Sequence, residues 1–87
     1  SRPAIDVLFE TAAWTFKKEL VGILLTGSNS DGAEGIKTIK QFGGTTIVEN
    51  PETAHAKSMP QAAIAKSDPD FILDLPDITA KIIELVN

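Results

Sequence analysis

The stretch Leu20–Gly35 reads LVGILLTGSNSDGAEG and contains the strongest structural signal in the chain. Its first six residues, 20–25, are continuously apolar and have the length of one β-strand. A strand without polar alternation is typical of a parallel sheet that helices cover on both faces. The glycine-rich turn that follows the strand, and the helical pattern after the turn, place Asp31 where parallel α/β sheets build their sites.

Helical and strand patterns alternate along the rest of the chain. Helices are expected from Pro3, over Ala33–Phe42, from Ser58 with Pro60 in its first turn, and over Pro76–Val86, and further strands over Thr45–Val48 and Phe71–Leu73. Gly43 and Gly44 end the second of these helices by allowing a left-handed backbone there. The alternation predicts an α/β fold, a mostly parallel doubly wound sheet with helices on both faces, with about three strands and four helices.

The first helix has one apolar face. Its members are spaced as on one side of a helix: Ile5, Leu8, Phe9, Ala12 and Phe16. Trp14 lies near this face, and we expect it to be partly buried. Three parallel strands would form a thin sheet whose two edges expose unpaired backbone groups. We therefore expect further strands from elsewhere, and an isolated chain that self-associates or is only marginally stable.

Composition narrows the classes of function. The 87 residues, 43% of them hydrophobic, make one small domain or part of one. The net charge of −4 and the scattered basic residues argue against a nucleic-acid partner. There is no cysteine and only one histidine, His55, so neither a metal nor a cofactor is expected. No apolar run approaches the ~20 residues of a membrane span and no signal peptide is visible, so we expect a cytoplasmic protein without membrane insertion.

Three roles for Asp31 follow from the residues around it. Asp31 and Glu34 resemble a capping box at the start of a helix. The turn could instead present backbone N–H groups to a phosphate, although the carboxylate would repel it and no lysine follows. Asp31 could also orient the histidine of a Ser-His-Asp triad, but no serine stands in a nucleophile-elbow pattern and His55 lies in a polar loop. The residues alone leave these roles open.

Four segments occur in one order with compatible spacing: Arg2–Glu10, Leu25–Gly35, Gly43–Ile47 and Ser58–Ile64. Together they resemble the C-terminal half of the catalytic domain of the chemotaxis protein-glutamate methylesterases. The resemblance extends from Arg2 to about Leu75. It identifies residues 1–87 as half of such a domain, with the upstream half absent from these residues.

The resemblance implies a serine hydrolase that removes methyl esters from glutamate side chains of chemoreceptors and often deamidates receptor glutamines. The aspartate of that family's triad matches Asp31. The family's serine and histidine lie in the upstream half, and His55 does not match the histidine. This chain alone is therefore expected to be inactive, and its partners are the receptor, the upstream half and, where one is present, a regulatory receiver domain.

The turn departs from the family pattern at two positions. The family has Thr-Gly-Met-Gly where this chain has Thr26-Gly27-Ser28-Asn29. The resemblance implies that the backbone N–H at Ser28 is a donor to the oxyanion, which survives the change of side chain, whereas Asn29 alters the backbone freedom of the turn. This departure and the missing triad members favour an alternative function, a diverged half-domain that serves as a non-catalytic interaction module. A second alternative is a small-ligand-binding α/β domain that uses the Asp31 turn.

Overall fold

The computed structural model describes residues 4–25, 32–50, 64–65 and 68–87, apart from the side chains of residues 4–6. The elements follow one another as α1 (Ala4–Phe16), η1 (Lys17–Glu19), β1 (Val21–Leu24), α2 (Ala33–Gln41), β2 (Thr45–Glu49), β3 (Phe71–Leu73) and α4 (Leu75–Val86). Of the helix expected from Ser58, only Ile64 and Ala65 are described, and both are helical. Pro3, Pro60 and His55 lie outside the described residues.

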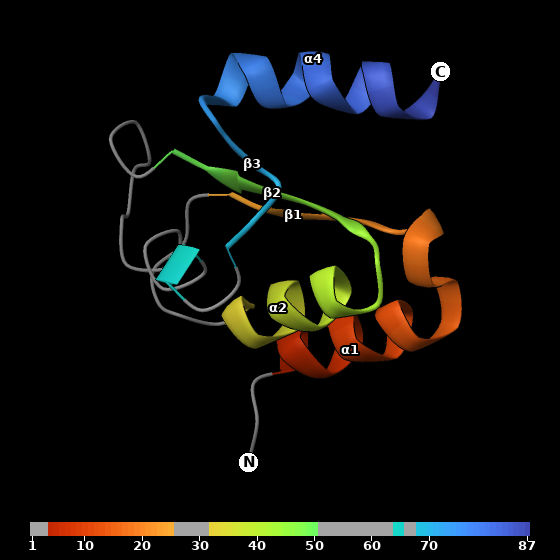
Figure 1. The fold of residues 1–87 in the computed structure, drawn as a ribbon. Helices are drawn as coiled ribbons and strands as arrows, with labels where there is room; N and C mark the ends of the chain where they lie inside the picture. The colour runs from red at the N-terminus through yellow and green to blue at the C-terminus, as the bar shows by residue number, and fades with distance from the viewer. Residues whose placement is uncertain (1–3, 26–31, 51–63, 66–67) are drawn as a thin grey trace.

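The described strands form a parallel sheet in the order β1-β2-β3. Val21 pairs with Thr45 at the amino ends of β1 and β2, and Glu49 pairs with Leu73 at the carboxyl ends of β2 and β3. Helices α1 and α2 lie on one face of the sheet and α4 lies on the other (Figure 1). The α/β class and the parallel, two-faced architecture expected from the sequence are thus confirmed.

Two glycines end α2, as the sequence predicted. Gly43 has a φ of +90°, and its N–H donates to the carbonyl of Lys40 over 3.0 Å. The N–H of Gly44 donates to the carbonyl of Ile39 over 2.9 Å, which completes a Schellman motif. The next N–H, that of Thr45, donates to the carbonyl of Leu20, so the chain passes from the helix cap directly into the sheet.

The core lies between the sheet and α2. Its buried side chains are those of Leu24, Ala33, Ile36 and Val48. Phe9 and Ile64, which are partly buried, pack against them. Gly22 allows α2 to come close to β1, because a Cβ there would lie 2.5 Å from Cδ1 of Ile39. Ile36 and Ile39 are buried and form the inward face of α2.

The apolar face of α1 is only partly covered. Helix α1 packs mainly against α2, where Ala13 is fully buried and Phe9 lies against Gly35. Leu8 and Phe16 stay 63% and 55% exposed. The prediction that Trp14 is partly buried is wrong, since it is 67% exposed; its ring forms a T-shaped pair with Phe42 and lies near the ammonium of Lys17. The physical reason is that most of the Trp14 side chain lies on a part of the α1 surface that the described elements do not cover.

Candidate functional site at the carboxyl edge of the sheet

The candidate site lies at the carboxyl end of β1. The strand ends at Leu24, which pairs with Val48 of β2, and α2 begins at Ala33. Residues 26–31 connect the two and include both predicted site residues, Ser28 and Asp31. These two residues lie outside the described part of the chain, so their predicted roles are judged through the elements that flank them.

The start of α2 corrects one sequence-based expectation. The first helical hydrogen bond runs from the N–H of Ile36 to the carbonyl of Gly32 over 2.9 Å, and Gly32 is the N-cap residue. Asp31 is therefore one residue before the cap, and Glu34 is the second helical residue rather than the third. The capping box predicted from Asp31 and Glu34 is wrong by one position.

Gly32 explains this shift. Its φ of +97° is a left-handed conformation that glycine adopts at no steric cost. A Cβ at Gly32 would also lie 2.7 Å from Cδ2 of Leu24. Gly32 therefore allows α2 to begin close to Leu24, the last residue of β1.

The amino end of α2 affects the charge of its surroundings. The helix macrodipole places positive partial charge at this end and stabilises a nearby negative charge by about 0.3–1 kcal/mol. Asp31 is separated from the first helical residue by Gly32 alone. The field at this helix end thus favours the ionised form of a nearby carboxylate.

Two polar residues at the end of β2 were not recognised from the sequence. Glu49 is only 3% exposed although it bears a carboxyl group. Asn50 follows it. Its N–H donates a hydrogen bond to the carbonyl of Leu73, and its Nδ2 donates to Oδ1 of Asp74 over 3.0 Å. Asp74 is the N-cap of α4, so this pair ties the carboxyl ends of β2 and β3 to that helix. Asn50 and Asp74 each directly follow a predicted strand, and this position in the sequence could have indicated that they lie together at the carboxyl edge of the sheet.

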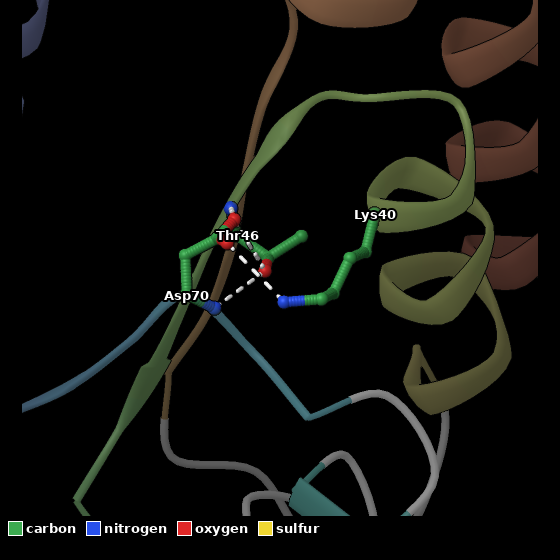
Figure 2. A network of polar contacts seen from close by, with 3 residues as sticks. All are labelled: Lys40, Thr46 and Asp70. Carbon is green, nitrogen blue, oxygen red and sulfur yellow. Dashed lines mark hydrogen bonds and ion pairs between the residues drawn. The ribbon is translucent and has the colours of Figure 1, made fainter.

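A second polar group lies at the opposite, amino end of the sheet, and Figure 2 shows it. Oδ2 of Asp70 accepts the backbone N–H of Thr46 over 2.9 Å and its hydroxyl over 3.2 Å. The N–H of Asp70 donates in turn to Oγ1 of Thr46, and Nζ of Lys40 lies 3.2 Å from Oδ1 of Asp70. The carboxylate thus bonds the N–H of Thr46 one residue before the paired part of β2 and β3 begins.

The pKa of Asp70 is lower than its usual 3.8. Partial burial acts to raise this pKa, but the N–H of Thr46 and the ammonium of Lys40 stabilise the charged form and outweigh burial. Because the carboxylate is satisfied by partners within the chain, it is a structural link between β2, β3 and α2 rather than a reactive group.

The described residues contain no nucleophile paired with a base. All five serines of the chain (1, 28, 30, 58 and 67) and its one histidine lie outside them. Within the described ranges, no three acidic or histidine side chains gather closely enough to hold a metal ion. None of the helices described here is long and apolar enough to cross a membrane.

Comparison with known proteins places this arrangement in a family. The sequence pattern of the CheB methylesterase family matches residues 1–82. A putative protein-glutamate methylesterase/protein-glutamine glutaminase of Leptospira interrogans is 48% identical over 85 residues, which are 98% of this chain and 44% of that protein. A protein-glutamate methylesterase/protein-glutamine glutaminase of Haloarcula marismortui is 42% identical over 98% of this chain and 23% of its own length.

One solved structure has the same fold. The crystal structure of the Thermotoga maritima CheB methylesterase catalytic domain superposes with a TM-score of 0.88 and 37% sequence identity. The superposition covers 97% of this chain but 44% of that domain. The chain thus spans less than half the length of each relative compared here.

Proposed function

The chain belongs to the CheB methylesterase family, and from this premise we propose that residues 1–87 are the C-terminal half of a protein-glutamate methylesterase catalytic domain, with Asp31 as its triad aspartate. The observation that carries the proposal is the position of the Asp31 turn, between the carboxyl end of β1 and the amino end of α2, within a fold that superposes on a methylesterase domain. The serine and histidine come from the part of the domain that this chain does not contain.

In the complete domain, the proposed triad would hydrolyse a glutamyl methyl ester in two stages. The serine hydroxyl attacks the carbonyl carbon of a glutamyl methyl ester, and the histidine takes the hydroxyl proton. Asp31 accepts a hydrogen bond from the other ring nitrogen, which fixes the histidine tautomer and stabilises the imidazolium. The histidine returns the proton to the leaving methoxide, and methanol departs. Water, activated by the same histidine, then attacks the glutamyl-serine ester, and the histidine returns the proton to the serine oxygen as the glutamate is released. With a glutamine substrate, ammonia leaves in the first step in place of methanol.

The backbone at Ser28 is proposed to donate one hydrogen bond to the oxyanion. A backbone N–H does not depend on the side chain, so serine serves as well as another residue at this position. Asn29 adopts positive φ less readily than glycine, which affects how this N–H is aimed. Losing one such donor costs about a hundred- to a thousandfold in rate. The change at Ser28-Asn29 is also the observation that favours the rival function, an interaction module without catalysis.

The relatives' names give methylated glutamates and glutamines of proteins as substrates, and the family resemblance adds chemoreceptors as the proteins that carry them. We assign the enzyme to methylated glutamates of chemoreceptors in the cytoplasm. No cofactor takes part in the steps above, since every proton is carried by the triad and the departing group is methanol or ammonia.

The test joins this chain to the upstream part of the Leptospira relative in one polypeptide. We expect no glutamyl methyl ester hydrolysis by the 87-residue chain and measurable turnover by the fusion. A Glu34→Gln fusion is a matched control, because Glu34 lies on α2 near the turn but has no role in the proposed steps. A fusion that folds as a compact monomer and shows no turnover would favour the interaction module instead. Turnover by the 87-residue chain itself would contradict the division of the triad.

A further inference from the structure

The outside of helix α1 is unusual for a surface helix. The helix packs against α2 and lies at the outside of the fold (Figure 1). Its side chains are described for residues 7–16, and the exposed ones among these are all uncharged: Val7, Leu8, Thr11, Trp14, Thr15 and Phe16. A surface helix normally carries charged residues opposite its core-facing stripe. The described outside of α1 therefore has the composition of a contact surface.

Three of these residues form a stripe that faces away from α2. Val7, Thr11 and Trp14 are spaced by four and three residues, which places them on one side of the helix. Thr11 lies about 160° around the helix from both Phe9 and Ala13, the residues that pack against α2. Val7 and Trp14 are 48% and 67% exposed, and the hydroxyl of Thr11 already donates to the carbonyl of Val7 over 2.9 Å. We call these three residues the outer stripe.

Trp14 is the largest side chain of the outer stripe, and neighbours in the same chain hold its ring. The ring centroids of Trp14 and Phe42 are 5.8 Å apart with the planes at 85°, and Nζ of Lys17 lies 5.6 Å from the Trp14 centroid. These contacts restrict a side chain that is still largely exposed. A tryptophan ordered in advance loses less entropy on binding, and tryptophan is enriched among the residues that dominate protein interfaces.

The charges near the outer stripe change sign along the helix. Asp6 and Glu10 belong to the amino-terminal half of α1, and Lys17 and Lys18 follow its carboxyl end. Two such helices in parallel would bring like charges together. An antiparallel pair instead brings the acidic half of each helix near the basic end of the other, as charged flanks do in coiled coils. The outer stripe is therefore complementary in charge to a second, antiparallel copy of itself.

We infer that the outer stripe of α1 is the contact between two copies of this chain, related by a two-fold axis that passes between Glu10 and Thr11. Residues 7 and 14 are equally far from this axis along the helix. Val7 of each copy therefore lies opposite the partner's Trp14, so that a small apolar side chain meets a large one twice. Such reciprocal contacts are the defining property of a two-fold interface.

The charged residues fit the same register. Along the helix axis, Lys17 and Lys18 of one copy lie within about one helical turn of the partner's Asp6. One helix from each copy makes a small contact, so the dimer is weak and reversible rather than obligate. The inference does not rest on the proposed function, because no residue of the outer stripe takes part in the proposed ester hydrolysis.

The first test uses Trp14 as a probe, since it is the only tryptophan of the chain. With rising concentration of the 87-residue chain, we expect sedimentation velocity to show a dimer. Trp14 emission should shift to the blue, and its quenching by acrylamide should weaken, over the same concentration range. A dimer that leaves Trp14 emission and quenching unchanged, as association through the sheet edges would, overturns the inference. So does a monomer at concentrations up to about 1 mM.

A matched pair of variants locates the contact. Trp14→Lys should lower the association constant at least about tenfold. Val86→Lys makes the same kind of change at a residue of α4 that is 73% exposed, and it should leave the association constant within about threefold. Circular dichroism of each variant shows whether its fold is kept. Equal effects of the two changes among folded variants would overturn the inference.

The chain has no cysteine, so single introduced cysteines test the register. Two copies of Thr11→Cys meet next to the axis and should form a disulfide-linked dimer on mild oxidation. In Val7→Cys the two cysteines lie about 10 Å apart along the helix axis, beyond the reach of a disulfide. Thr11→Cys should therefore crosslink at least about tenfold faster. Equal rates would contradict the antiparallel register.

The fusion with the upstream part of the Leptospira relative tests the other occupant of this face, which is the rest of the domain. We expect the fusion to dimerise as the 87-residue chain does and to crosslink through Thr11→Cys. A fusion that stays monomeric up to about 1 mM and does not crosslink would overturn the inference, whether or not it hydrolyses ester. Dimerisation without ester turnover would contradict the proposed function alone.

Discussion

The two ends of the sheet differ in how their polar groups are used. At the amino end, the carboxylate of Asp70 accepts hydrogen bonds from Thr46 and pairs with Lys40, so its partners all come from this chain. At the carboxyl end, residues 25–32, which include Asp31, connect β1 to α2. The last of them, Gly32, has a left-handed backbone that glycine adopts readily. The difference shows that the role of a charged residue near a strand end is interpreted from its partners: those of Asp70 make it a structural residue, whereas the chemistry at the carboxyl end belongs to the proposed function.

The largest effect on stability is expected from Gly32→Ala at the carboxyl end. Alanine at a φ of +97° is strained, and its Cβ would meet Leu24 at 2.7 Å. Together these effects should lower the free energy of unfolding by about 2–4 kcal/mol, measured by urea denaturation.

Gly43→Ala is the matched control at the amino end. Gly43 has a similar φ of +90°, but a Cβ added there would lie 3.5 Å from the nearest atom, Cβ of Lys18, which is an ordinary contact. We expect a loss of about 1–2 kcal/mol, from the backbone conformation alone. Equal losses for the two glycines would show that the contact with Leu24 does not constrain the start of α2.

A middle-sized effect is expected from Thr46→Val at the amino end. Valine keeps the shape of this fully buried residue but removes the hydroxyl that accepts the N–H of Asp70. The free energy of unfolding should fall by about 1–2 kcal/mol. In an active fusion with the upstream part, ester turnover per folded molecule should stay unchanged. A loss of turnover without a matching loss of stability would contradict the purely structural role of the Thr46 and Asp70 pair.

The predictions from sequence succeeded where the signal was local. The run of apolar residues identified β1, the pair Gly43-Gly44 identified the end of α2, and Phe71–Leu73 is the third strand with the expected bounds. Each of these depends on residues within one turn or one strand. The start of α2 at Ala33 was also predicted, but its cap was assigned to Asp31 instead of Gly32, because that choice depends on the close approach of Gly32 to Leu24.

Contacts between distant residues could not be predicted. Thr46 and Asp70 are 24 positions apart, and nothing near either residue indicates the other. The exposure of Trp14 and Phe16 depends on which elements lie next to α1, which helical periodicity does not specify. For the site itself, family resemblance supplied the roles of Asp31 and Ser28, and both stay predictions.

A smaller effect depends on pH. The lowered pKa of Asp70 means that its charged form is favoured in the folded chain, so its contribution is present above the usual value of 3.8 and is lost as the pH falls through the lower folded value. The difference in unfolding free energy between the wild type and Asp70→Asn should therefore be constant from pH 7 to 5 and shrink toward pH 3. A difference that grows on acidification would contradict the assignment.

The smallest effect is expected from Lys40→Met. The Lys40 and Asp70 side chains are 35% and 37% exposed, so solvent screens their attraction. The loss should be about 0–0.5 kcal/mol and should vanish in 1 M NaCl, measured by urea denaturation at both salt concentrations. A loss that is large and independent of salt would mean that packing of the lysine stem, rather than its charge, holds the amino end together.

The catalytic role of Asp31 is tested most directly by Asp31→Asn in the active fusion with the upstream part. Asparagine can hydrogen-bond near a helix start as aspartate does, but it has no charge and holds the wrong histidine tautomer. We expect near-normal unfolding and a loss of ester turnover of about ten-thousandfold, the size that the same change has in a serine protease. Turnover within about threefold of the parent, or ~0.7 kcal/mol in activation free energy, would contradict the catalytic role of Asp31.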